Sequence, residues 1–280
     1  MSTSGGVKLF DKSMCLVQDD TTIVASSGQA SAERCIDRNP ISYWRSVGST
    51  DLSTEELEIT FNEAKTFDRI FLVDHNFKSY NIQYFSGGIY NHFASVVSIN
   101  NASMSNITET TYARDTSYYE FTEVTATKIR IQVTTTQVVD AQKYLNQVIV
   151  TTELGTLQGY PQIKGTEISR NLRNEKMLSG RTLTFKSDDF FKVQLDFKDY
   201  PASLSDDIDL IFSLHDMETT FLIWLCGGRL GTPYFKKQMR GYRLRDVIPV
   251  QLIASLKPVY SDNVYNNTVN FSAQFQESVD

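Results

Sequence analysis

Residue types that often carry out catalysis are present in this chain, but none stands at a spacing that predicts a catalytic centre. The three histidines, His75, His92 and His215, lie far apart and have no second ligand at metal-motif spacing. The segment from Gly227 to Gly231 is rich in glycine but lacks the Gly-Lys-Ser/Thr ending of a phosphate-binding loop. No serine or cysteine lies in a nucleophile motif. We therefore expect no catalytic residue, metal or cofactor, and we expect that the protein is not an enzyme.

Clustered carboxylates are the remaining candidates for acid-base chemistry. Asp188 and Asp189 form one group, and Asp206, Asp207 and Asp209 form another. Two carboxylates that face each other across a sugar can hydrolyse a glycosidic bond. The second group is better explained by the start of a helix, where acidic residues are favourable, and the first by a turn between strands. No Asp-x-Asp-x-Asp-Gly run marks a calcium loop.

A group of aromatic and polar residues between positions 76 and 93 could instead bind a sugar. Aromatic rings offer an apolar face for stacking, and amides, amines and imidazoles bond to hydroxyl groups. The candidate ligand-binding residues are Asn76, Phe77, Lys78, Tyr90 and His92. Phe93 belongs to the same stacking platform. Trp44 and Tyr80 belong either to that platform or to the core, and for Trp44 we favour the core.

A basic stretch follows residue 228 and has three interpretations. It could contact a neighbouring subunit, form a solvated loop or bind nucleic acid, and we rank these in that order. The net charge of −6 argues against a nucleic-acid partner. The candidate interface residues are Arg229, Tyr234, Lys236, Lys237, Arg240, Tyr242, Arg243 and Arg245.

Composition limits the remaining possibilities. The 280 residues are 41% hydrophobic, which is enough for ordinary cores, and the many Phe, Tyr, Thr, Val and Ile residues favour strands. No apolar segment reaches the ~18 residues of a membrane helix, and the first residues lack a signal-peptide core. The three cysteines, Cys15, Cys35 and Cys226, form no recognisable pair. We expect reduced thiols, no membrane insertion and assembly inside a cell.

Short alternating stretches indicate an all-β fold. They occur at 22–25, 57–61, 67–73, 80–85, 118–121, 128–133 and 146–150, with turn residues between several of them. Alternation at regular intervals is typical of an antiparallel sandwich with one solvated face per sheet. Glycines and a proline between 154 and 161 predict a domain boundary, which gives domains at 1–155 and 156–280.

The N-terminal half carries a family resemblance. Its residues Ala30, Ala32, Asp37, Asn39, Pro40, Tyr43, Trp44, Arg45 and Ser46 stand in the order found in that family. The strands 57–61 and 128–131 follow in the same order. This region resembles the discoidin, or coagulation factor type C, jelly roll, which is galactose-binding-like. The resemblance implies a jelly-roll sandwich, a buried Trp44 and a surface that could bind glycans.

The stretch 204–253 organises the C-terminal half. Leu204, Ile208 and Ile211 recur at helical spacing, and Ser205 with the acids that follow suits a helix start. The apolar run 221–226 predicts a strand buried on both faces, and the chain returns in a strand at 247–253. The order of helix, buried strand, basic loop and alternating strand at 265–275 resembles sandwich domains of distal-tail and tail-tube proteins of tailed phages.

Together these features give one main hypothesis and two alternatives. The main hypothesis is a non-enzymatic virion protein, assembled in the host cytoplasm, whose C-terminal domain forms a ring with copies of itself and other tail proteins. Its jelly roll would then display a surface for a host glycan. The alternatives are a free-standing carbohydrate-binding protein and an ancillary binding domain of a glycan-processing enzyme.

Overall fold

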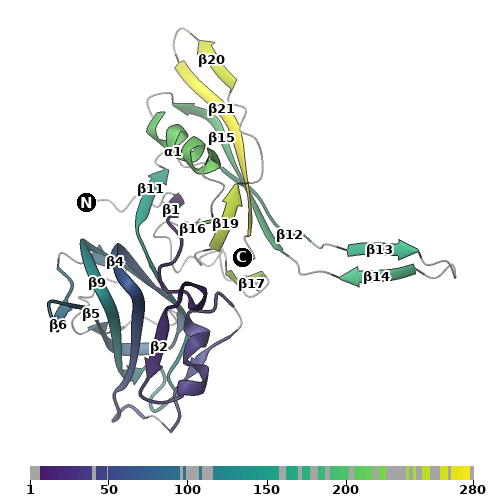
Figure 1. The fold of residues 1–280 in the computed structure, drawn as a ribbon. Helices are drawn as coiled ribbons and strands as arrows, with labels where there is room; N and C mark the ends of the chain where they lie inside the picture. The colour runs from purple at the N-terminus through teal and green to yellow at the C-terminus, as the bar shows by residue number, and fades with distance from the viewer. Residues whose placement is uncertain are drawn as a thin grey trace. The chain divides into compact units, whose positions relative to one another are not determined.

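The computed structural model confirms an all-β protein of antiparallel sheets. It describes residues 7–39, 42–48, 50–94, 97–98, 107–108, 116–157, 162–169, 172–176, 182–186, 190–201, 205–216, 220–224, 238–239, 242–243, 248–252, 259–263 and 266–277. Two compact units make up the chain (Figure 1). We call Asp11–Glu153 the insert unit, because it interrupts a second unit, the split unit, formed by Val7–Phe10 together with the described residues from Leu154 onward.

The insert unit is a nine-stranded sheet folded over one core. Its strands lie in the order β3-β10-β4-β9-β5-β6, with β2 on β4, β7 on β9 and β8 on β5. The strands are β2 (Thr22–Ala25), β3 (Trp44–Arg45), β4 (Glu55–His75), β5 (Phe77–Ser86), β6 (Ile89–His92), β7 (Val97–Ser98), β8 (Ile107–Thr108), β9 (Thr116–Thr136) and β10 (Tyr144–Thr151). Two short 3₁₀ helices, η1 (Val17–Asp19) and η2 (Gln29–Cys35), belong to the same unit.

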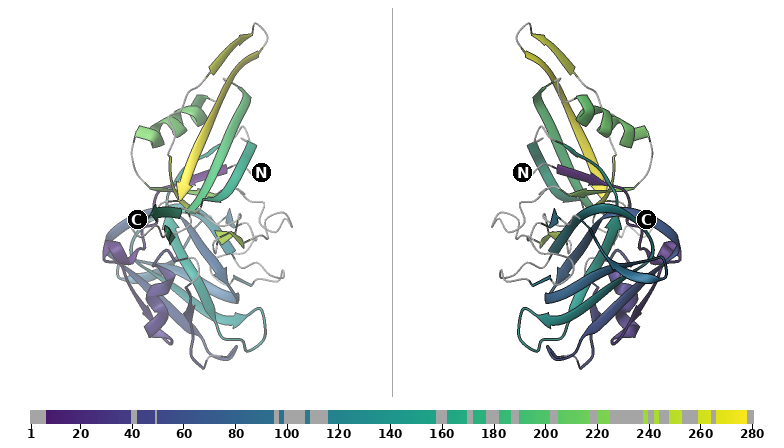
Figure 2. Two further views of the ribbon diagram at one scale, coloured as in Figure 1. Left: turned by 90° about the vertical axis from the view of Figure 1, so that its right-hand side faces the viewer. Right: turned by 90° about the vertical axis from the view of Figure 1, so that its left-hand side faces the viewer.

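Two long strands, β4 and β9, run side by side through both layers of this sandwich (Figure 2). The first half of β4 pairs with β2 and with the second half of β9, which in turn pairs with β5. The second half of β4 pairs with β10 and the first half of β9. Register shifts between Thr60 and Lys65 and between Phe67 and Arg69 mark the change of layer. The sequence predicted four shorter strands here, and the structure joins them in pairs into β4 and β9.

The core of the insert unit confirms the preferred interpretation of Trp44 as a core residue, and it decides the open question of Tyr80 in favour of the core. Trp44 is completely buried and donates from Nε1 to the Ser27 carbonyl at 3.0 Å. Gly28 makes this packing possible, since its φ is +67° and a Cβ there would lie 2.0 Å from the Arg45 carbonyl oxygen. Cys15 and Cys35 are buried free thiols, as expected.

The split unit contains an eight-stranded sheet in the order β11-β1-β16-β19-β21-β15-β12, with β20 on β21. Its strands are β1 (Val7–Phe10), β11 (Glu153–Leu157), β12 (Gln162–Ser169), β15 (Phe190–Pro201), β16 (Phe221–Trp224), β19 (Ile248–Leu252), β20 (Val259–Asn263) and β21 (Asn266–Glu277). All four residues of β16 are buried, which confirms the strand predicted from the apolar run. Helix α1 (Ser205–Asp216) begins with Asp206 and Asp207 in its first turn, also as predicted.

Two features of the split unit differ from the sequence-based boundaries. The segment predicted as a linker contains strand β11, and Gly155 serves there as a contact site, where a Cβ would lie 2.5 Å from Leu210 of α1. Strand β1, expected to lead into the first domain, pairs instead with β16. Two further pairs of strands form separate two-stranded sheets. One consists of β13 (Leu172–Lys176) and β14 (Thr182–Lys186), and the other of β17 (Gln238–Met239) and β18 (Tyr242–Arg243).

Candidate functional site

One polar sheet face of the insert unit gathers the described side chains best suited to hold a ligand. Five strands, β2, β4, β9, β5 and β6, pair side by side and span ~19 Å at ordinary strand spacing. Alternate residues such as Leu57, Ile131 and Ile82 point into the core. The residues between them form what we call the polar face: Val24, Glu56, Glu58, Asn81, Gln83, Phe85, Tyr90, His92, Lys128, Arg130 and Gln132.

Tyr90 is held across this face by contacts at both ends and on one side. Its hydroxyl donates a hydrogen bond to Oε2 of Glu58, which lies three strands away on β4. The Arg130 guanidinium carbon is 3.8 Å from the ring centroid, and Phe85 meets the ring edge-on at 5.2 Å. The Tyr90 side chain is half-buried, so part of the residue remains open to solvent. Tyr90 therefore presents a fixed, flat aromatic surface.

Polar groups around Tyr90 are ordered by contacts with one another. Lys128 donates to Glu58 Oε1 at 2.8 Å, and Arg130 donates from Nε and Nη2 to Gln83 Oε1 at 3.1 and 2.6 Å. Since Gln83 Oε1 is already an acceptor, its amide nitrogen is the donor toward His92 Nε2 at 3.3 Å. Each charged group keeps part of its hydrogen-bonding capacity for a ligand. The face thus offers donors and acceptors beside an apolar ring.

Electrostatics at this face follow from the same contacts. Burial raises the pKa of Glu58, but hydrogen bonds from Lys128 and Tyr90 outweigh it and lower that pKa below its ordinary value. Burial, followed by the Glu58 carboxylate, raises the pKa of Tyr90 to about 12. At neutral pH the Glu58 carboxylate is therefore charged, and the Tyr90 phenol keeps the proton that it donates. The anchor of Tyr90 is stable over the physiological range.

The structure divides the five ligand-binding residues predicted from sequence. Tyr90 and His92 lie on the polar face. Lys78 is exposed at the start of β5, ~23 Å along the strand from the position opposite Tyr90. Sequence proximity between residues 76 and 93 was therefore a poor guide to a common site, because the segment runs out along β5 and back along β6.

Asn76 and Phe77 are structural and correct the prediction. Asn76 donates to the Gln142 carbonyl at 2.8 Å and accepts from the Tyr144 amide at 3.0 Å, which ties β4, β5 and β10 together. Phe77 is completely buried beside His75, with ring centroids 4.9 Å apart. Its ring has no face for a ligand.

Glu58, Gln83, Lys128 and Arg130 were not predicted as site residues. The alternating stretches did indicate that these residues lie on the polar side of their strands, because every second residue there is polar. Strand pairing was needed to bring them together, because they come from β4, β5 and β9. No local motif could have assigned them to one surface.

The basic stretch gives no described site. Arg229, Tyr234, Lys236, Lys237, Arg240 and Arg245 lie outside the described residues, while Tyr242 and Arg243 form the short strand β18. The subunit interface assigned to these residues stays a prediction.

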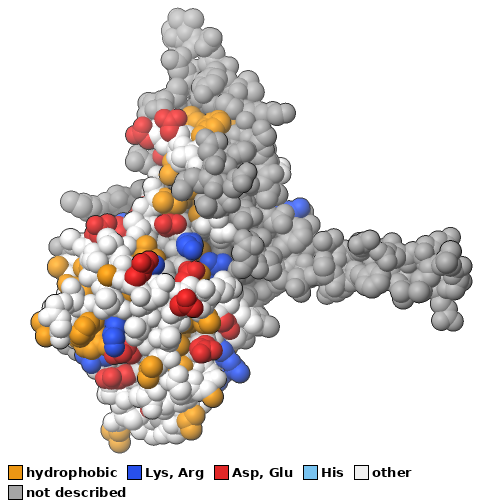
Figure 3. All heavy atoms as spheres, viewed as in Figure 1, with side chains coloured by type: hydrophobic (Ala, Val, Ile, Leu, Met, Phe, Trp, Pro, Cys, Tyr) orange, Lys and Arg blue, Asp and Glu red, His pale blue; other side chains and the backbone are white. Residues whose placement is uncertain are grey.

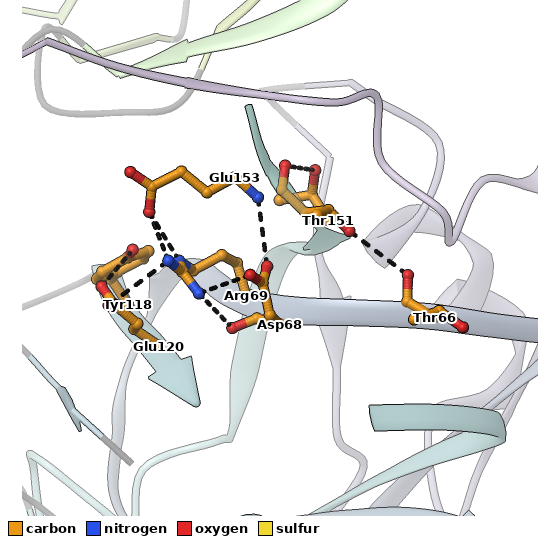
Figure 4. Close-up of polar contacts among 8 residues, drawn as sticks. Thr66, Asp68, Arg69, Tyr118, Glu120, Thr151 and Glu153 are labelled. Atoms are coloured by element: carbon orange, nitrogen blue, oxygen red, sulfur yellow. Dashed lines mark hydrogen bonds and ion pairs between the residues drawn. The ribbon is translucent and has the colours of Figure 1, made fainter. Parts of the chain in front are cut away.

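A second polar cluster, around Arg69, has a structural role (Figure 4). Arg69 bonds to Glu153 Oε2 from Nη2 at 2.5 Å and from Nε at 3.1 Å, and pairs with Asp68 at 3.0 Å. Glu120 lies 3.5 Å from Nη2 and accepts from Tyr118 at 3.2 Å. Arg69 is 8% exposed and its donors already have acceptors, so within the insert unit this cluster joins strands β4 and β9 to Glu153.

Two other types of site are absent from the described residues. They contain no group of three His, Cys, Asp or Glu side chains arranged to hold a metal ion. Among the same residues, no helix has the length and apolar character needed to cross a bilayer. Acidic and basic side chains lie interspersed on the visible surface of the insert unit, without a patch of one sign (Figure 3).

No protein-family model and no curated protein matches the sequence. Similar solved structures include chitosan-binding module 1 of a Paenibacillus sp. IK-5 chitosanase/glucanase, with 21% identity and a TM-score of 0.38 over 49% of this chain and 97% of that one. The family 32 carbohydrate-binding module of Clostridium perfringens NanJ, solved with galactose, has 15% identity and a TM-score of 0.40 over 50% and 98%. A putative alpha-L-fucosidase from Bacteroides thetaiotaomicron has 13% identity and a TM-score of 0.37, with 48% of this chain and 28% of that chain covered. These structures match about half of this chain, and none of the three named here is a phage-tail protein.

Proposed function

We propose that the insert unit is a carbohydrate-binding module and that its polar face holds the sugar. One observation carries the proposal: the half-buried Tyr90 ring is held by Glu58 and Arg130, with further hydrogen-bonding side chains around it. A sugar ring has an apolar face of C–H groups that stacks on an aromatic ring, and hydroxyls at its rim that both donate and accept. The Tyr90 surface and its neighbours Lys128, Gln83 and His92 complement both parts.

The charge of the face favours a sugar over the other ligands that stack on aromatic rings. Nucleic acids also stack on tyrosine, but they require a surplus of positive charge along the backbone path. Here Glu56 and Glu58 stand among the basic residues, and the whole chain carries a net charge of −6. A ligand rich in hydroxyl groups satisfies such a mixed surface without charge repulsion.

A glycan array followed by calorimetry of the full chain tests this proposal. The wild-type protein should bind at least one glycan, and Tyr90→Ala should reduce the affinity about tenfold or more, because it removes the stacking surface. Ile89→Ala is the matched control, since Ile89 is an exposed apolar residue on the same strand. Absence of binding to any glycan, or equal loss in both variants, would refute the polar face as the site.

A second candidate function is that of a subunit in a larger assembly such as a phage tail. The observation that favours it is the β13–β14 ladder, which pairs with no other described strand. A two-stranded hairpin is marginally stable on its own and gains stability when another chain covers or extends it. Light scattering of the purified protein, together with micrographs, tests this role. A monomer at all concentrations would count against a ring formed by this chain alone.

A further inference from the structure

We propose a second binding site, for an oxyanion group, at a corner of the insert unit formed by Arg45 and Tyr144. Both residues lie away from the polar face, on the paired strands β3 and β10. We call this pair, with the neighbouring Tyr43, the arginine corner. It is independent of the carbohydrate site proposed above and takes the carboxylate or sulfate group of an acidic ligand.

The guanidinium of Arg45 is held in place by aromatic rings. Its central carbon lies 5.3 Å from the ring centroid of Tyr43 and 5.5 Å from that of Tyr144. The two rings meet edge to face, with centroids 5.7 Å apart and planes at 85°. Cation–π contacts of this kind orient an arginine without using its N–H groups. Trp44, the preceding residue, is buried in the core and fixes the backbone from which Arg45 projects.

Two donors of this corner, the Arg45 guanidinium and the Tyr144 hydroxyl, bond to no acceptor among the described residues. Among the described residues, no hydrogen bond or ion pair reaches the Arg45 guanidinium, and Arg45 is exposed. The Tyr144 hydroxyl likewise makes no hydrogen bond to a described residue. Burial is the main factor that raises the pKa of Tyr144, followed by the charge of Asp74, so the phenol stays protonated and can donate. Donors without acceptors are complemented by a group that only accepts.

The Asp74 carboxylate, whose charge acts on Tyr144, is bonded to Tyr43. Tyr43 donates its hydroxyl to Asp74 Oδ2 at 2.5 Å, and the Asp74 amide donates to Thr116 at 3.4 Å. Asp74 therefore contributes negative charge near the rings while Arg45 keeps its planar set of donors. A planar carboxylate or a sulfate can accept two parallel N–H bonds from such a guanidinium, which is the strong form of this interaction.

The test is an NMR titration of the full chain carrying Tyr90→Ala, so that the polar face is disabled. Sodium glucuronate and glucose are the main probes, because glucuronate carries a carboxylate where glucose has a hydroxymethyl group. Glucuronate should shift the Arg45 Nε–H signal and the Tyr144 ring signals, and glucose should leave them unchanged. Glucose 6-sulfate and inorganic sulfate identify the source of the oxyanion. If inorganic sulfate shifts these signals as much as glucuronate and glucose 6-sulfate do, the site is supported and it recognises the oxyanion without the sugar.

Variants make the assignment specific to the corner. Arg45→Met and Arg45→Lys should each lower glucuronate affinity about tenfold or more, since lysine keeps the charge but loses the planar fork. Tyr144→Phe should lower it a few-fold. Arg34→Met is the matched control, because it removes the same charge from another exposed arginine. Equal shifts with glucose and glucuronate, retained binding in Arg45→Met, or equal loss in Arg34→Met would overturn the proposal.

Discussion

The Tyr90 hydroxyl donates to the Glu58 carboxylate across β9 and β5, so one side chain bridges the sheet from its edge strand to its middle. The bond couples the two ionisations, because the carboxylate raises the pKa of the phenol. It also places the ring over Arg130, which makes this pair the structural basis of the proposed sugar site.

Replacing Glu58 with Gln should lower the pKa of Tyr90 from about 12 toward its ordinary value of 10.0, because the negative charge is removed. Burial is the larger cause of the shift, so the pKa should stay above that value. Titration of the Tyr90 ring carbon by NMR measures it. Glu63→Gln, a change at an exposed carboxylate on the same strand, is the control and should leave Tyr90 unchanged. A Tyr90 pKa that does not fall in the Glu58 variant would show that the two groups are not bonded in solution.

Gly28→Ala should strongly destabilise the insert unit. The positive φ of Gly28 already costs a non-glycine residue ~1–2 kcal/mol, and the new Cβ would also collide with the Arg45 carbonyl. Gly87→Ala separates the two effects, because Gly87 has φ +63° but nothing within 4 Å of its Cβ position. Chemical denaturation should show a loss for Gly28→Ala clearly larger than for Gly87→Ala. Equal losses would mean that β3 shifts easily away from Gly28.

Acid should destabilise the insert unit through His75. Complete burial lowers the pKa of this imidazole from 6.5 to about 3, and its two nitrogens contact Ser117 Oγ at 2.9 Å and the Phe77 amide at 3.1 Å. The unfolded chain binds the proton below pH 6.5 while the folded chain does not, so stability is complete above that pH and falls down to about pH 3. From pH 7 to 5.5 the free energy of unfolding should drop by roughly 1 kcal/mol from this group alone.

His75→Gln supplies the comparison for that pH dependence. Glutamine does not titrate, so the variant should be less stable at pH 7 but lose less stability between pH 7 and 5.5. Urea denaturation at both pH values measures the difference. An unchanged slope in the variant would assign the acid sensitivity to other groups.

Cys15 and Cys35 should not react with thiol reagents until the insert unit unfolds. Both are buried, and burial raises the pKa of Cys15 to about 11 and that of Cys35 further. The Cys226→Ala variant leaves only these two thiols. At pH 8 a thiol reagent should label them slowly in buffer and rapidly in denaturing guanidinium chloride. Rapid labelling of the folded variant would contradict the buried positions.

Sequence patterns predicted what depends on local order. The apolar run at Phe221–Trp224 and the acidic start of α1 were recognisable because burial and helix capping act over a few residues. Trp44 was also assigned correctly, from its place in a family-like motif. Pairing over long range was not predictable: Val7–Phe10 bonds to β16, more than two hundred positions later. The same limit applied to the site, where Tyr90 was predicted but its partners Glu58 and Arg130 were not, because only the β4–β9–β5–β6 register brings them together.

The placement of β1 beside β16 has a consequence for how the protein is made. A ribosome produces Val7–Phe10 roughly 10 to 40 seconds before Phe221–Trp224 emerges, so the first strand must wait unpaired while the insert unit is synthesised. That strand belongs to the split unit, and the two ends of the insert unit meet where the Asp11 amide donates to the Thr152 carbonyl at 3.0 Å. In the nascent chain the insert unit should therefore fold before the split unit. A ribosome that stalls before codon 221 would leave a folded insert unit between two unstructured segments.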